Sequence, residues 1–181
     1  MTLAHENMMT HIPSKPARWE ELCHDIGLAV LLAQKVQFAL AHYYACHQCV
    51  RAGWNKTQAQ EKIDYFLSTP MGVVWREVKN QTPLPDSLTT QIEAFKTDRD
   101  WLVHNFDQES TRFISRGERI DEYISRMEAI SAQAQDIMLK LDAIGDELMR
   151  EKGVDPEEDD RRTAQGMSQQ PPAFYVAPRR K

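Results

Sequence analysis

The chain of 181 residues is 41% apolar and 27% charged, and its formal net charge is −5 at pH 7. This composition is ordinary for one globular domain with a core of its own. The acidic balance argues against a protein that coats nucleic acid nonspecifically, although it leaves room for a local basic cleft.

Three cysteines cannot all pair with one another, so no disulfide framework is expected and a reducing, cytoplasmic location is predicted. The long apolar run at 26–32 is much shorter than a membrane span, and the N-terminus lacks the basic and apolar regions of a signal peptide. We therefore expect no membrane association.

Residues 1–15 are expected to form a loose arm, because Pro13 and Pro16 delay regular structure. A first helix should start near Pro16, and Gly53 is placed to end it. Its apolar positions step by four and three in a heptad-like pattern: Leu22, Ile26, Ala29, Ala33, Val36, Leu40, Tyr43, His47 and Val50.

Two short helices should follow. Thr57 and Gln60 have the spacing of a capping box that opens a helix through Leu67. Thr69 and Pro70 then resemble the cap and first residue of another helix.

The prolines at 83 and 85 interrupt the helical pattern, and Asp86 or Ser87 is a suitable cap for a helix that runs through Phe106. The pattern over 107–115 is ambiguous. A last helix is predicted over 116–152, with Gly153 closing it. This last helix is about 55 Å long, and the preceding helix can cover only roughly half of it. Its other half therefore needs another partner, and a second copy of the chain is favoured.

Residues 154–181 combine an acidic cluster with Gln, Ser and Pro, a composition typical of a disordered tail. An alternative is a short recognition segment in which Phe174, Tyr175 and Val176 anchor a partner protein.

The helix before the ambiguous region contains an anomaly, because Arg99 falls inside its apolar stripe. The apolar members of that stripe are Leu88, Ile92, Phe95, Leu102 and Phe106. Burying a guanidinium without partners is costly, so an anionic group should meet Arg99. Five residues later comes His104, whose imidazole is suited to proton transfer near neutral pH.

This Arg-x-x-x-x-His spacing in an all-helical chain, with Asp100 after the arginine and an aromatic residue two positions after the histidine, resembles the HEPN (higher eukaryotes and prokaryotes nucleotide-binding) domains. The resemblance covers residues 17–152, and its specific part is confined to positions 99–106. HEPN domains are dimerising bundles of four or five helices, and many are ribonucleases in toxin–antitoxin, antiviral or RNA-processing systems.

The resemblance implies that Arg99 neutralises the scissile phosphate and that His104 is the general acid or base when the ribose 2′-hydroxyl attacks phosphorus. It implies no metal or cofactor, and products with 2′,3′-cyclic phosphate and 5′-hydroxyl ends. Asp100, four residues before His104, could orient the imidazole or raise its pKa, and Asn105 is a second supporting candidate.

Five helical residues correspond to roughly 140° of rotation, so Arg99 and His104 leave an ideal helix on different faces. A cleft shared by two chains across a two-fold axis is the favoured way to join them, and the monomer would then be inactive. Phe106 stands where a subgroup of the family has a tyrosine that accepts a nucleotide, so any antidote should act by binding or at another site.

Candidate substrate-binding cations follow the motif. Arg112, Arg116 and Arg119, with Arg126 further along, could line one edge beside it. The alternative is a solvated helix face, since acidic residues are interspersed.

The sequence also allows three interpretations that involve no catalysis. Arg99 could belong to a satisfied interhelical network, in which it pairs with a carboxylate of the first helix or with Asp100. His42, Cys46 and Cys49 share a helical face and could bind zinc with Cys23 or His24, although the turn typical of such sites is missing. A purely structural bundle could hold a partner through its last helix and tail.

The sequence therefore predicts an all-α, antiparallel bundle of four to five helices over 16–153 that dimerises. Its predicted function is that of a metal-independent endoribonuclease acting as a toxin or antiphage-defence effector. A non-catalytic nucleotide-binding, RNA-binding or protein-interaction module is the alternative. The partners this interpretation implies are RNA, a second copy of the chain, and an antitoxin or regulatory protein.

Overall fold

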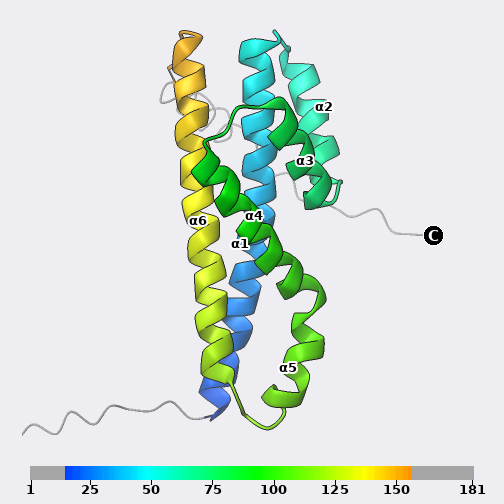
Figure 1. The fold of residues 1–181 in the computed structure, drawn as a ribbon, viewed down its shortest axis with the longest axis vertical. Helices are drawn as coiled ribbons and strands as arrows, with labels where there is room; N and C mark the ends of the chain where they lie inside the picture. The colour runs from blue at the N-terminus through cyan, green and yellow to red at the C-terminus, as the bar shows by residue number, and fades with distance from the viewer. Residues whose placement is uncertain (1–14, 156–181) are drawn as a thin grey trace, which may run out of the picture.

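The computed structural model describes residues 15–155 of the chain, and side chains over 17–155. Most of the predicted N-terminal arm and nearly all of the predicted tail, including Phe174, Tyr175 and Val176, lie outside the described residues. Within that range the fold is all-helical and contains no strand (Figure 1). Its helices are α1 (Lys15–Arg51), α2 (Lys56–Leu67), α3 (Met71–Gln81), α4 (Asp86–His104), α5 (Phe106–Ile114) and α6 (Ile120–Glu151).

The two long helices, α1 and α6, run side by side in the same direction (Figure 1). Arg18 binds Asp121 at one end of the pair, and Arg51 Nη2 lies 2.5 Å from Glu151 Oε2 at the other. Residues about 100 positions apart therefore face each other along the whole length. The interface buries the heptad positions of both helices, among them Leu22, Ala29, Ala33, Val36, Leu40, Met127, Ile130, Ala134, Ile137 and Leu141.

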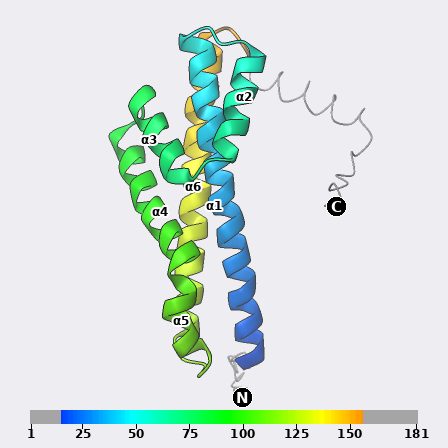
Figure 2. The same ribbon diagram turned by 90° about the vertical axis from the view of Figure 1, so that its right-hand side faces the viewer.

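Helix α4 runs in the opposite direction and packs on α6 and α1 (Figures 1 and 2). Gln91 Nε2 donates to Asp136 Oδ2 at 2.6 Å near the start of α4, and Arg126 Nη2 donates to Asp98 Oδ1 at 3.3 Å further along. Helices α2 and α3 pack on the half of α1 that ends at Arg51, and α5 continues from α4 toward the other end of the molecule (Figure 2).

The predicted all-helical fold and the long C-terminal helix are confirmed, but the antiparallel arrangement is wrong for the two longest helices. The structure also has six helices over 15–155 in place of four to five, because the ambiguous region is itself the helix α5. Helices α4 and α5 run in the same direction, so α5 ends at the end of the molecule where α1 begins (Figure 1). Helix α6 must then run parallel to α1.

The parallel pairing also removes the reason for expecting a second copy against the far half of α6. Leu141 and Leu148 are buried there within a single chain, and Cys46 Sγ lies 3.7 Å from the carbonyl oxygen of Gly145. Helix α1, with 37 residues, covers this half of α6.

Local capping differs in detail from the prediction. Asn55 and Gln58, not Thr57 and Gln60, form the capping box of α2, with both hydrogen bonds at 3.0 Å. Pro70 occupies the N-cap position of α3 in place of the first helical position. The first helix ends as predicted, and Gly53 adopts a left-handed conformation with φ of 71°.

Helix α6 begins at Ile120, four residues later than predicted, because residues 115–119 form a turn. Gly117 and Arg119 both have positive φ in this turn, at 69° and 58°. A non-glycine residue in this region is strained, so the surrounding contacts must hold Arg119 there.

By length and composition alone, α1 is one helix among the described residues that could cross a membrane, which the short apolar run at 26–32 did not suggest. The buried helix of a helical bundle passes the same test. One side of α1 packs on α6, α2, α3 and α4, as a core helix does.

Candidate functional site

Arg99 lies on the face of α4 that turns toward the core, as its place in the apolar stripe predicts. Leu88, Ile92, Phe95 and Leu102 are buried along that face. The side chain of Arg99 is 25% exposed, however, and its Nη1 donates to Asp100 Oδ1 at 3.1 Å. The guanidinium is therefore only partly buried, and the anion that meets it is the neighbouring carboxylate.

Asp100 is the centre of a small ionic cluster. Its Oδ1 accepts from Arg99, and its Oδ2 accepts from Lys96 Nζ at 2.7 Å. Partial burial opposes ionisation of this carboxyl, but the two cationic donors outweigh burial, so the pKa of Asp100 lies below its usual value. No hydrogen bond joins Asp100 to His104 in the part of the chain that the structure describes. In a single chain Asp100 thus binds Arg99, and this ionic cluster lies within α4 and not between helices.

His104 is the last residue of α4, and its side chain is exposed. It lines a shallow pocket of about 470 Å³ together with Lys96, Thr97, Asp100, Trp101, Asn105 and Arg126. Arg99 is not part of this lining. The predicted separation of Arg99 and His104 on different faces of the helix is therefore present, and α4 shows no irregularity before His104 that brings them together.

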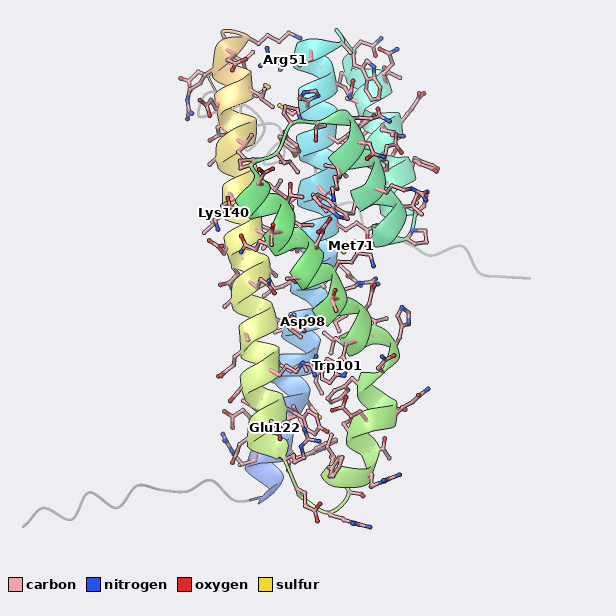
Figure 3. All side chains as sticks on the ribbon, in the orientation of Figure 1. Arg51, Met71, Asp98, Trp101, Glu122 and Lys140 are labelled. Carbon is pink, nitrogen blue, oxygen red and sulfur yellow. The ribbon has the colours of Figure 1, made fainter. Side chains whose placement is uncertain are left out.

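Arg126 of α6 covers Trp101 of α4, and Figure 3 shows Asp98 and Trp101 on the part of α4 beside α6. The Arg126 guanidinium carbon lies 3.3 Å from the centre of the Trp101 ring system, a stacked cation–π contact. Trp101 Nε1 also donates to Glu109 Oε2 of α5 at 2.7 Å. These contacts join α4, α5 and α6 at the edge of the pocket.

The arginines predicted to line one edge beside the motif have different surroundings in the structure. Arg119 donates from Nε and Nη2 to the carboxylate of Glu122, at 2.6 and 2.5 Å, and its guanidinium lies over Phe113 and Tyr123. This pairing raises the pKa of Arg119, and it holds the strained turn before α6. Arg112 and Arg116 are exposed, and over residues 15–155 neither has an anionic partner.

Asn105 separates α4 from α5, and its backbone N–H donates to the carbonyl of Trp101 at 2.8 Å. After it, the Phe106 ring packs edge-to-face between Trp101 and Tyr123, with centroids 5.6 and 5.5 Å away. The phenyl ring offers no hydroxyl that could accept a nucleotide at this position.

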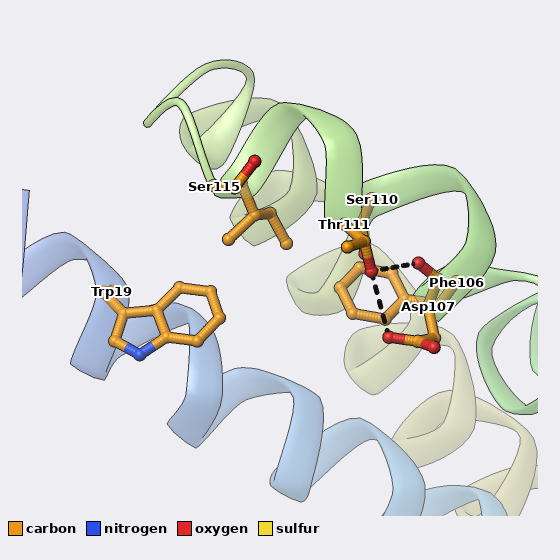
Figure 4. A pocket seen from close by; sticks show the side chains of 7 residues that line it. Trp19, Phe106, Asp107, Ser110, Thr111 and Ser115 are labelled. Atoms are coloured by element: carbon orange, nitrogen blue, oxygen red, sulfur yellow. Dashed lines mark hydrogen bonds between the residues drawn. The ribbon is translucent and has the colours of Figure 1, made fainter.

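A second hollow, of about 450 Å³, lies between α1 and α5 (Figure 4). Trp19 and Phe106 line it, together with Asp107 and Thr111. Thr111 Oγ1 donates to the carbonyl and the carboxylate of Asp107, at 2.6 and 3.1 Å. Thr111 and Asp107 therefore bind each other, and none of the residues that line this hollow is cationic.

No cluster of three or more His, Cys, Asp or Glu with metal-binding geometry occurs between residues 15 and 155. The zinc arrangement considered for His42, Cys46 and Cys49 is not formed. His42 stacks on Phe38 with ring centroids 4.3 Å apart, and the Cys46 thiol contacts Gly145.

No family model matches the chain, and neither the curated proteins nor the solved structures include a significantly similar chain. The HEPN resemblance stays a prediction from the residues around Arg99 and His104.

Lys96 is the residue of this site that the sequence pattern around Arg99 did not point to. Its distance from Asp100 is the i,i+4 spacing that allows a helical ion pair, which could have been found from the sequence. The stacking of Arg126 on Trp101 has no such local signal, because it depends on how α4 and α6 pack.

We expect Asp100→Asn to lower the free energy of unfolding at pH 7 by less than about 1 kcal/mol, since the ion pairs are partly exposed. Because the folded-state pKa of Asp100 is depressed, this stability is present above the unfolded-state pKa and is lost as the pH falls through the folded-state pKa. Urea unfolding at several pH values should show the difference between the two proteins shrinking as the pH falls through the folded-state pKa of Asp100. A difference that is independent of pH, or equally large in Glu128→Gln, would contradict the cluster.

Arg126→Ala should lower the free energy of unfolding by about 1 kcal/mol, because it removes the stacking on Trp101. Arg126→Lys should recover part of this loss. Chemical denaturation followed by circular dichroism measures both, with Arg150→Ala as the matched control on the exposed part of α6. Equal effects of Arg126→Ala and Arg150→Ala would show that the stacked contact contributes nothing.

Proposed function

We propose that the protein is a HEPN-type, metal-independent endoribonuclease whose catalytic residues are Arg99 and His104. The observation that carries the proposal is the exposed imidazole at the open end of α4, in a pocket that also presents Lys96 and Arg126. A phosphodiester entering this pocket would meet two cations and a group able to transfer a proton. Arg112 and Arg116 extend the positive charge toward the next helix.

In the proposed reaction, His104 removes the proton of the ribose 2′-hydroxyl, and the freed oxygen attacks the adjacent phosphorus. The bond from phosphorus to the 5′-oxygen breaks, and a proton returns to that oxygen, which leaves a 2′,3′-cyclic phosphate and a 5′-hydroxyl. Arg99 stabilises the charge that develops on the phosphoryl oxygens. A toxin or antiphage-defence role in the cytoplasm is the biological setting we propose.

The position of Arg99 supports a site shared by two chains. Within one chain its guanidinium binds Asp100, which lines the pocket of His104, but Arg99 itself is not part of that lining. We therefore propose that Arg99 of one copy completes the site of the other. Phosphate then competes with Asp100 for the guanidinium, and Lys96 keeps the carboxylate neutralised when Arg99 is released.

A non-catalytic nucleotide- or RNA-binding module is the second candidate. The ion pairs among Lys96, Arg99 and Asp100 favour it, because they give Arg99 a structural role without substrate. Such a protein would bind RNA through the same cations but leave it intact.

Cleavage of a mixed RNA pool in excess EDTA tests the enzyme directly. The full chain should produce cyclic-phosphate ends, and His104→Ala should reduce the rate by about 10² or more. Glu128→Gln, which changes an exposed residue of α6 outside the pocket, is the control and should cleave normally. Binding of RNA without cleavage by the folded wild-type protein would refute the enzyme and support the binding module.

The shared site makes a separate prediction for two inactive variants. Arg99→Ala and His104→Ala should each be inactive alone, but their co-expression should restore about a quarter of wild-type activity. Random pairing makes about half of the dimers mixed, and each mixed dimer has one intact site of two. RNA cleavage by the co-purified pair measures this, and an inactive mixture with wild-type-like dimer content would place each site within one chain.

A further inference from the structure

Helix α1 carries a second heptad pattern, which consists of exposed residues and ends at His42, beside α6. We call it the open α1 face, and it consists of His24, Leu28, Leu31, Lys35, Phe38 and His42, with steps of four and three. All six side chains are exposed within the chain. Leu28 is 37%, Leu31 is 51% and Phe38 is 42% exposed, although these are large apolar residues.

The outer face of a surface helix is normally rich in charge, and the open α1 face is not. Lys35 is its one lysine or arginine, and Glu20 lies one helical turn before His24. An 18-residue stretch of α1 reaches a mean hydropathy of 1.2, but only 33% of it is buried. A single exposed apolar residue such as Leu139 of α6 is ordinary, whereas a repeated pattern indicates an interface.

Gly27 lies beside this face in the middle of α1, and no contact among residues 15–155 explains it. It is exposed, and a Cβ added there would meet no atom within 4 Å. Glycine weakens the interior of a helix relative to alanine, so a sequence gains nothing from it in the single chain. A second helix that packs closely at this position would explain why the residue is a glycine.

We propose that the open α1 face binds a second copy of the same chain, with the two α1 helices antiparallel across a two-fold axis. This register places Leu28 of each copy against Leu31 of the other, with Gly27 beside the axis. It also brings Lys35 of one copy within about one helical turn of Glu20 of the other, twice. A parallel pair would instead place Lys35 beside Lys35.

The charge pattern favours a second copy over a lipid bilayer. Helix α6, which runs beside α1, has exposed charges along its length, including Asp121, Asp136 and Lys140, and these would oppose insertion of the pair. The face spans 19 positions from His24 to His42, or about 28 Å. A contact of this length is at the small end of specific interfaces, so the dimer should dissociate in the micromolar range, on the order of 10 µM.

This contact is separate from the motif surface. The open α1 face belongs to α1, whereas Lys96 and His104 line a pocket on α4 that contains no residue of α1 (Figure 2 shows the two helices). The inference does not rest on the proposed ribonuclease function. Variants of α1 should alter self-association and leave the residues of the candidate site in place.

Sedimentation velocity of the full chain from about 1 to 100 µM tests the proposal. The wild type should self-associate as its concentration rises, and Leu31→Glu should weaken the step that depends on α1 by more than about tenfold, whether or not the motif surfaces also pair. Leu139→Glu is the matched control and should not change it. A wild-type chain that stays monomeric at every concentration, or a dimer that Leu31→Glu leaves unchanged, would overturn the proposal.

Gly27 in α1 and Gly145 in α6 give a paired measurement. Gly27→Ala and Gly145→Ala should each raise the melting temperature of the monomer, since a Cβ at either position meets nothing within 4 Å. Only Gly27→Ala should weaken the dimer, by several-fold. Equal dimerisation of the two variants would show that no helix approaches Gly27 closely.

A charge exchange tests the antiparallel register. Glu20→Lys and Lys35→Glu should each weaken self-association, because each places like charges together. Mixing these two variants should produce a heterodimer stronger than either homodimer, and the double variant should recover the wild-type dimer. Heterodimers no stronger than the homodimers would refute the register, and wild-type monomer that sediments with anionic phosphatidylglycerol vesicles through α1 would identify a membrane as the occupant.

Discussion

The parallel contact between α1 and α6 is the constraint on which the other parts of the structure depend. Its two helices bury one apolar face each along their whole length, and ion pairs fix both ends through Arg18 and Arg51. Burial of this many aliphatic side chains outweighs the partly exposed ion pairs, which mainly fix the register. Helix α4 packs on this pair, so its two ends, and with them the pocket at His104, are positioned by α1 and α6.

Much of this fold could be predicted from the sequence, because the long helices have a heptad-like pattern with glycine at their ends. The direction of α6 relative to α1 could not, since it depends on α5. That helix has nine residues and few apolar positions, and its acidic first turn, with Asp107 and Glu109, is equally compatible with a loop. Because α5 continues in the direction of α4, it determines the end of the molecule at which α6 begins.

The sequence indicated the residues of the candidate site better than it indicated how they are arranged. Arg99 was found because an arginine in an apolar stripe needs an anion, and Asp100 supplies that anion in the structure. The spacing of five residues was enough to predict that Arg99 and His104 leave α4 on different faces. The contact of Arg126 with Trp101 depends on how two helices pack, and no local pattern indicates it. The assignment of RNA cleavage still rests on the motif spacing.

The separation of about 100 residues between contacting positions also governs how the protein is made. While the ribosome synthesises α2 to α5, the face of α1 that α6 will cover has no native partner. The core closes only after the last helix has left the exit tunnel, and a large loop must be ordered in that step. Nascent chains arrested before Ile120 should therefore expose both apolar sides of α1 and depend on chaperones until α6 arrives.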